Sequence, residues 1–285
     1  MHPQTINFAY LCVPVVHGHD DEIIDMRIVM IGAGRLASHL TRALYQAGHE
    51  ILQVYSRTGK SAIPLARMVN AVPVTDVSEL AAGADLYIMS VKDDALATLI
   101  PQVSEIVKDK VVVHTAGSVP MSVFEGHAEH YGVFYPMQTF SKEREVDFAE
   151  IPCFLEAGDA PTLELLGQVA ASVSRKVYSL SSEQRRYLHL AAVFACNFVN
   201  HCYAMASDLL QKNGIPFEVM YPLIDETAAK VHAMSPAQAQ TGPAVRYDTS
   251  VITRQSEMLK DNPVVREVYD KMSLSIHQKE KQNHD

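Results

Sequence analysis

The stretch Ile28-Val29-Met30-Ile31-Gly32-Ala33-Gly34-Arg35-Leu36-Ala37 decides the fold of this 285-residue chain. Its apolar, branched start predicts a strand buried on both faces, as at the centre of a parallel sheet. Gly32, Gly34 and Ala37 follow at G-x-G-x-x-A spacing, which gives a tight turn, close approach of a pyrophosphate and close packing of helix on strand. From Leu36 the apolar residues recur at helical spacing. The stretch therefore predicts a strand, turn and helix that bind a dinucleotide, with its phosphates on helix N–H groups.

The end of the second predicted strand indicates which dinucleotide is bound. Glu50 to Tyr55 is followed by Ser56-Arg57-Thr58, about twenty residues past the glycines, where an NAD site places a carboxylate on the ribose. Here a guanidinium and two hydroxyls suit a 2′-phosphate, and Lys60 adds charge. We therefore expect NADP(H), while the alternative makes Arg57 a solvated loop residue.

Composition narrows the class of protein and its partners. A hydrophobic content of 48% supports one large or two ordinary domains, and a net charge of −9 with a pI near 5.8 argues against nucleic acid or anionic membrane as partners. No apolar run is long enough to span a membrane. The four cysteines show no metal-ligand spacing, so we expect no metal and free thiols in a reducing cytoplasm. We expect residues 1–25 to be an N-terminal extension, possibly disordered, without the features of a secretory signal.

Alternating strand and helix patterns continue to about residue 180 and predict a doubly wound, mainly parallel α/β sheet over residues 26–180. Two loops leave predicted strand ends, where such sheets bind ligands. One contains Val91 and Lys92, and the other contains Thr115 and Gly117, so both are candidates for contacts near the nicotinamide. Alternatively, these loops only cap helices, and His114 is a core histidine.

The pattern becomes all-helical over residues 181–285. A capping box at Ser181 predicts one long helix that ends near Asn213-Gly214. This apolar helix carries His189, Asn197 and Asn200, which an even helical period places on one face. We interpret this polar face as the wall of an active site, with a hydrogen-bonded stripe between domains as the alternative.

A second polar cluster lies in the segment from Gln240 to Asp248. Thr241 and Gly242 could form a turn before a helix that begins near Pro243, a favoured first helical residue. Such a helix end can bind an anion, and Arg246 could clamp a carboxylate. The alternative is a helix cap with a surface pair between Arg246 and Asp248.

Together these motifs, with Tyr135-Pro136-Met137-Gln138-Thr139-Phe140, resemble the Rossmann-like, DUF2520-containing NADP oxidoreductases, distant relatives of pyrroline-5-carboxylate reductase and 6-phosphogluconate dehydrogenase-like enzymes. The resemblance covers about residues 26–277. It implies a Rossmann domain, a C-terminal helical domain like that of 6-phosphogluconate dehydrogenase, and NADP(H). The family often has His where this chain has Tyr135, which leaves open an acid–base role at that position.

By analogy with the related reductases, the first long helix of the second domain presents polar residues to the nicotinamide. We therefore expect a reductase of a small carbonyl or imine compound that carries a carboxylate, with a homodimer built through the helical domain. The alternatives are a non-catalytic NADP(H)-binding module and an F420-coupled NADP reductase.

The site residues expected from the sequence fall into three groups. Those expected to bind the cofactor are Gly32, Gly34, Arg35, Leu36, Ala37, Ser56, Arg57, Thr58, Val91, Lys92, Thr115 and Gly117. The expected catalytic residues are His189, as proton donor, and Asn197, and the expected substrate residues are Asn200, Thr241, Gly242 and Arg246.

Overall fold

The computed structural model describes residues 25–141 and 144–284, so the expected N-terminal extension lies outside the described residues except for Asp25. The chain divides into two compact units, Met1–Phe194 and Ala195–Asp285. We predict a domain boundary near residue 180 from sequence, and this stays a prediction.

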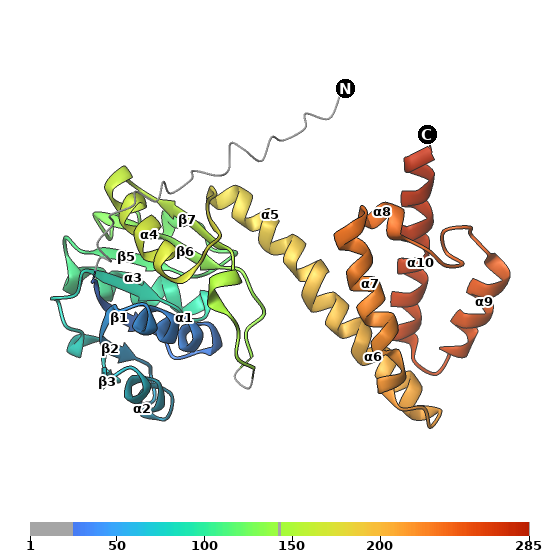
Figure 1. Cartoon of the computed structure of the whole chain (residues 1–285), viewed down its shortest axis with the longest axis horizontal. Helices are drawn as coiled ribbons and strands as arrows, with labels where there is room; N and C mark the ends of the chain where they lie inside the picture. Colours follow the sequence, from blue (N-terminus) through green and yellow to red (C-terminus); the bar gives the residue numbers. More distant parts are fainter. Residues whose placement is uncertain (1–24, 142–143, 285) are drawn as a thin grey trace. The chain divides into compact units, whose positions relative to one another are not determined.

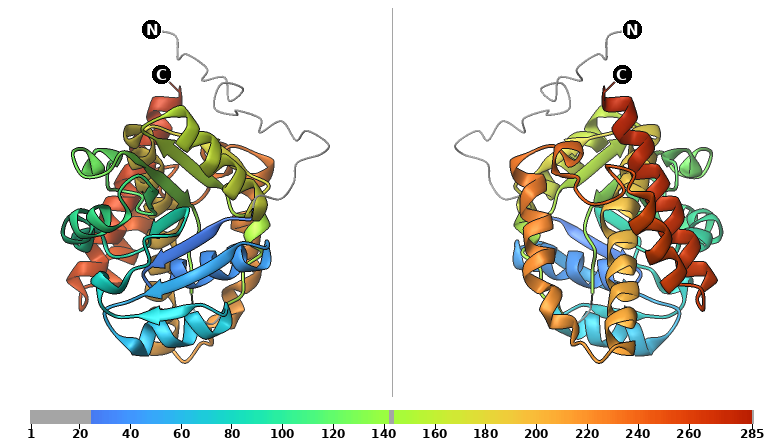
Figure 2. Two further views of the ribbon diagram at one scale, coloured as in Figure 1. Left: turned by 90° about the vertical axis from the view of Figure 1, so that its left-hand side faces the viewer. Right: turned by 90° about the vertical axis from the view of Figure 1, so that its right-hand side faces the viewer.

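The first unit contains an eight-stranded sheet with the order β3-β2-β1-β4-β5-β6-β7-β8 (Figures 1 and 2). All neighbouring strands are parallel except β6 and β7, which confirms the predicted doubly wound, mainly parallel sheet. The strands are β1 Arg27–Ile31, β2 Glu50–Tyr55, β3 Val72–Val74, β4 Leu86–Met89, β5 Val111–His114, β6 His130–Pro136, β7 Cys153–Ala157 and β8 Val177–Ser179.

Alternate residues of β1 pack into two different cores, one on each face of the sheet. Ile28 and Met30 pack in a cluster with buried apolar residues of helices α1 (Arg35–Gln46), α2 (Gly59–Met68) and α4 (Ala160–Val173). Val29 and Ile31 pack on the other face, with α3 (Asp93–Val107) and Phe124. Because both faces of β1 are buried, the strand reads as an unbroken apolar run rather than an alternating one.

The second unit is helical in its described residues. Its helices are α6 Val199–Lys212, α7 Tyr221–Ala233, α8 Pro236–Ala239, α9 Thr249–Met258 and α10 Pro263–His284. The capping box predicted at Ser181 is present at the start of α5 (Ser182–Ala192), in the first unit. The short helix α8 was not predicted, although Ser235 and Gln238 form a capping box there as well.

The predicted long helix is interrupted by a π-helical turn, Val193–Phe198, which joins α5 to α6. A π turn holds more residues than an α turn. The even helical period therefore does not hold across this turn, and the shared face of His189, Asn197 and Asn200 stays a prediction.

The helix predicted to begin near Pro243 begins instead at Thr249. Positive φ angles at Gly242 (109°) and Tyr247 (52°) bend the preceding backbone out of helical geometry. The Asp248 carboxylate accepts a hydrogen bond from the Val251 N–H at 3.2 Å and caps the new N-terminus. The predicted helix start near Pro243 is therefore wrong, whereas the roles of Thr241, Gly242 and Arg246 in binding a substrate anion stay predictions.

Candidate active site

The predicted cofactor loops of the first unit meet at one edge of the sheet, at the carboxyl ends of the parallel strands. Backbone hydrogen bonds join them: the Gly32 N–H donates to the Tyr55 carbonyl at 2.8 Å, and the Ser90 N–H donates to the Ile31 carbonyl at 2.7 Å. The Thr115 N–H donates to the Met89 carbonyl at 3.2 Å. The ends of β1, β2, β4 and β5 are thus held side by side, where ligands of doubly wound sheets bind.

The glycine turn has the geometry that a dinucleotide requires. Gly32 has a φ of +124°, and a Cβ there would lie 2.1 Å from the Ser90 carbonyl oxygen, so no larger residue fits. A Cβ on Gly34 would meet nothing within 4 Å, which leaves open space in front of the helix. Among the described residues no side chain caps α1 and none is acidic in its first turn. The turn therefore fits a pyrophosphate on the positive end of α1.

The loop after β2 presents the side chains predicted to select the 2′-phosphate. Arg57 and Thr58 are exposed and Ser56 is half-buried. The part of the chain that the structure describes offers the Arg57 guanidinium no hydrogen bond or ion pair, so its donors are available to a ligand.

The loop after β4 packs directly against the glycine turn. The Val91 Cγ1 would lie 3.4 Å from a Cβ on Gly32. The following exposed residue, Lys92, precedes α3, and the Asp93 carboxylate accepts a hydrogen bond from the Ser118 hydroxyl of the neighbouring loop. This bond ties the two predicted nicotinamide-side loops together.

A histidine and a tyrosine meet at Gly117 in the loop after β5. The His189 Nδ1, from α5, lies 3.1 Å from the Tyr135 hydroxyl, near the carboxyl end of β6, and the two rings meet edge to face. Gly117 makes this contact possible, since a Cβ there would lie 2.5 Å from the His189 Nδ1 and 3.0 Å from the Tyr135 Cζ. Tyr135 is buried and His189 half-buried. The structure thus brings together two predicted residues, Gly117 and His189, with Tyr135 as their neighbour.

His114 lies in the core of the first unit. Its side chain is completely buried and stacks on Phe124, and its Nδ1 accepts the Ala116 N–H at 3.1 Å. Burial, aided by the positive charge of Arg185, lowers the pKa of His114 to about 4, so its imidazole is neutral near pH 7. It shapes the backbone of the Thr115 to Gly117 loop.

The remaining predicted residues belong to the second unit. Asn197 lies in the π-helical turn and Asn200 in α6, and both side chains are exposed. Thr241 and Arg246 are exposed, and Gly242 is half-buried, in the turns before α9. The Asp248 carboxyl has a lowered pKa, chiefly through hydrogen bonds from Ser250 and Val251, with a smaller effect of the Arg246 charge. The roles of these residues stay predictions.

Two residues beneath the site escaped the sequence analysis, namely Glu156 in β7 and Arg185 in α5. They form an ion pair one helical turn from His189, in which Arg185 is buried and Glu156 is half-buried. A glutamate inside the otherwise apolar strand Cys153–Ala157 is the signal that could have found this pair, because a buried carboxylate needs a partner.

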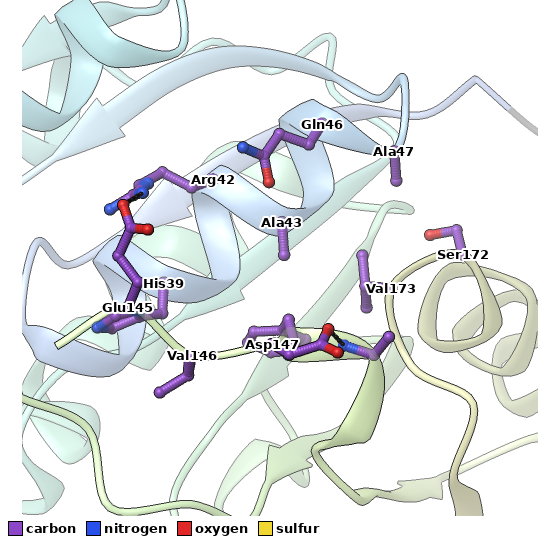
Figure 3. Close-up of a pocket in the computed structure, with 12 residues that line it drawn as sticks. His39, Arg42, Ala43, Gln46, Ala47, Glu145, Val146, Asp147, Ser172 and Val173 are labelled. Atoms are coloured by element: carbon purple, nitrogen blue, oxygen red, sulfur yellow. Dashed lines mark hydrogen bonds and ion pairs between the residues drawn. The ribbon is translucent and has the colours of Figure 1, made fainter.

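A pocket of about 410 Å³ lies elsewhere in the first unit (Figure 3). His39, Arg42 and Gln46 of α1 line it opposite Asp147, Ser172 and Val173. None of the predicted site residues is among its lining residues, so it is separate from the glycine turn and the Tyr135–His189 pair.

No described helix has both the length and the apolar character needed to cross a membrane. Of the four cysteines, Cys153, Cys196 and Cys202 are free, and Cys12 lies outside the described residues.

Two family models match the chain. The model described as "NADP oxidoreductase coenzyme F420-dependent" matches residues 27–117, and the domain of unknown function DUF2520 matches residues 151–276. The first covers the glycine turn and both loops near the predicted nicotinamide position. The second covers His189 and the helical unit up to residue 276. Comparison with curated proteins gave no match.

Solved structures share the whole architecture. One from Bacteroides fragilis, described as a putative NADP oxidoreductase, is 54% identical, with 90% of this chain and 100% of that chain covered and a TM-score of 0.86. An imine reductase from Myxococcus stipitatus in complex with NADP+ is 20% identical over 90% of this chain and 95% of its own, with a TM-score of 0.69. A pyrroline-5-carboxylate reductase from Streptococcus pyogenes is 16% identical, with 89% of this chain and 99% of that chain covered and a TM-score of 0.60. The last two show the fold alone.

The fold and the edge of the sheet define a Rossmann-type oxidoreductase with a C-terminal helical region. The identity and coverage of the Bacteroides fragilis relative are decisive for the family. The chain belongs to the DUF2520-containing NADP oxidoreductases, as the sequence motifs predict.

Proposed function

We propose that this chain is an NADPH-dependent reductase of a small carbonyl or imine compound that carries a carboxylate. The observation that carries the proposal is the Tyr135–His189 pair at Gly117, on the same edge of the sheet as the dinucleotide turn. NADPH, when bound, supplies a hydride. The chain must then deliver a proton to the developing anion, and a histidine suits that task near neutral pH.

Tyr135 supports a defined tautomer of His189. The phenol O–H can donate a hydrogen bond to the Nδ1 of a neutral imidazole. The remaining imidazole proton is then on Nε2, away from the tyrosine. After His189 gains a second proton, its Nδ1–H can donate to the phenol oxygen instead. The hydrogen bond therefore orients the ring in both protonation states.

The backbone N–H groups at the start of α1 would hold the pyrophosphate, and the open space at Gly34 admits it. Arg57, with Ser56 and Thr58, would hold the 2′-phosphate, because a guanidinium offers a planar fork of donors. The remaining roles rest on the sequence alone. We propose Asn197 as the orienting group, and as substrate anchors Asn200, Thr241, Gly242 and Arg246.

Replacing Arg57 by Ala should weaken NADPH binding about tenfold to a hundredfold, because hydrogen bonds to a charged group contribute about 1.5–3 kcal/mol. NADH, which lacks the 2′-phosphate, should bind about as before. Calorimetric titration of both nucleotides measures the difference. The matched control is Arg67→Ala, at an exposed arginine in the following helix α2, which should change the affinity for neither NADPH nor NADH. Equal losses for NADPH and NADH, or a native preference for NADH, would contradict the assignment of Arg57.

The match of residues 27–117 to an F420-dependent family model keeps an F420-coupled reaction as a second candidate. That match covers only the dinucleotide-binding part of the chain. It therefore supports NADP binding and does not indicate whether the second reactant is F420. Hydride exchange between NADPH and an added deazaflavin, with no oxidation of NADPH by imino or keto acids, would favour this candidate.

We infer a homodimer built through the helical unit. Among its described residues only Ala244 and Leu259 are buried apolar residues, while Val219 and Leu223 are each 57% exposed and Met258 is 78% exposed. Such apolar exposure is typical of an interface. Light scattering at micromolar concentration should give twice the 31.5 kDa chain mass. A monomer under these conditions would remove the inference.

A further inference from the structure

Glu156 and the buried Arg185 form an ion pair one helical turn from His189. The Arg185 side chain is 1% exposed and the Glu156 side chain 16% exposed, and the Arg185 Nη1 donates to the Glu156 carboxylate. Arg185 precedes His189 by four residues in α5, so both lie on the same side of this helix.

The pair joins three segments of the first unit. The Glu156 carboxylate, from β7, accepts hydrogen bonds from the backbone N–H and the hydroxyl of Ser182, both at 2.7 Å. The Arg185 Nη2 donates to the Val119 carbonyl at 2.6 Å, and the Met121 N–H donates to the Ser182 hydroxyl at 2.9 Å. The first turn of α5 is thereby fixed to β7 and to the segment that follows Gly117.

Stability alone does not explain this arrangement. The Arg185 Nε is buried without a hydrogen-bond partner in the described part of the chain, so the guanidinium is not fully compensated. Replacing a buried ion pair by uncharged residues of similar size is often neutral for stability. The pair fixes the position of α5 against the loop after β5. The contact between the helix and this loop is so close that Gly117 has no room for a Cβ.

We propose that Glu156 and Arg185 are positioning residues that hold His189 against Gly117 and Tyr135. Neither residue lies in a predicted cofactor loop. They act by fixing the start of α5, so that the His189 imidazole keeps its hydrogen bond to the tyrosine and its direction. The proposal rests on the proposed role of His189 as proton donor. Displacement of a reacting group by about 1 Å can cost a hundredfold in rate.

The test removes both charges together in the variant Glu156→Gln/Arg185→Met, which leaves no unpaired ion inside the protein. We expect a melting temperature close to that of the wild type, a kcat lowered about tenfold or more, and a Kd for NADPH within about twofold of the wild type. The matched control is Glu150→Gln/Arg175→Met, an exposed ion pair of the same unit, which should change none of these values. An unchanged kcat in the folded Glu156→Gln/Arg185→Met protein would overturn the proposal.

The same paired substitution in a His189→Ala background distinguishes positioning from general damage. If the pair acts through His189, kcat should not fall further in that background, whereas an equal further loss would overturn the proposal. If the paired variant does not fold, Arg185→Lys keeps the charge but replaces the two-armed guanidinium by a single ammonium, and it should show the same selective loss of kcat.

Nitrogen NMR of the His189 imidazole separates a failure of this proposal from a failure of the proposed function. If His189→Ala leaves kcat unchanged, the role of His189 as proton donor is wrong. The positioning role then still requires that the signal of a hydrogen-bonded Nδ1, present in the wild type, is lost in Glu156→Gln/Arg185→Met. An unchanged signal would refute the positioning role.

Discussion

Replacing His189 by Ala should lower kcat about a hundredfold to ten-thousandfold, the range typical for loss of a positioned general acid. The Kd for NADPH should stay within about twofold, because the predicted cofactor contacts come from the loops after β1, β2, β4 and β5 rather than from α5. Steady-state rates with the best substrate from a panel of imino and keto acids give kcat, and titration of NADPH gives the affinity.

The control for this variant is His127→Ala, at an exposed histidine between β5 and β6, which should leave kcat unchanged.

A second variant displaces the His189 imidazole by a substitution at Gly117, which the imidazole contacts. In Gly117→Ala the added Cβ would lie 2.5 Å from the His189 Nδ1 and 2.8 Å from its Cγ, so the ring must move away. This variant should lose much of kcat with His189 still present. Wild-type rates in both His189→Ala and Gly117→Ala would show that the pair takes no part in the reaction.

The glycine turn provides the second large effect, as a contrast between two neighbouring positions. Gly34 has an ordinary φ of −76°, and an added Cβ meets open space, so Gly34→Ala should fold with the wild-type melting temperature. The methyl group would enter the space proposed for the pyrophosphate, so NADPH binding should weaken about tenfold or more, or about 1.4 kcal/mol at least. Thermal unfolding with and without NADPH measures both quantities.

Gly32→Ala should behave in the opposite way. Its φ of +124° and the 2.1 Å approach of a Cβ to the Ser90 carbonyl oxygen strain the folded state before any ligand binds. We expect the melting temperature to fall, with a loss of about 1–3 kcal/mol of stability. If Gly34→Ala instead bound NADPH as tightly as the wild type, the pyrophosphate would not lie in front of α1.

The first unit could be predicted in detail because its signals are local. The buried run Ile28 to Ile31, the glycine spacing and the alternation of strands and helices each depend on a few neighbouring residues, and the sheet follows from them. The family was predictable for the same reason, since its motifs are short and lie at strand ends.

Other features depend on contacts that no local pattern contains. The π-helical turn at Val193–Phe198 changes the period of a helix whose sequence reads as regular. The helix α9 begins at Thr249 with Asp248 as its N-cap, because the positive φ of Tyr247 breaks the helical backbone just before it. The pairing of Glu156 with Arg185 joins residues far apart in the chain, so the sequence indicates at most that each needs a partner.

We propose that this NADP oxidoreductase reduces a small carbonyl or imine compound and that His189 supplies the proton. The most direct test is to follow the oxidation of NADPH by the purified protein with a panel of cyclic imines, imino acids and keto acids, beside thermal unfolding with NADPH. We expect NADPH to be oxidised with at least one carboxylate-bearing compound, and this activity to be lost in His189→Ala. If NADPH raises the melting temperature but no compound of the panel is reduced, the result would contradict the proposed reductase function and favour a module that binds NADP(H) without turnover.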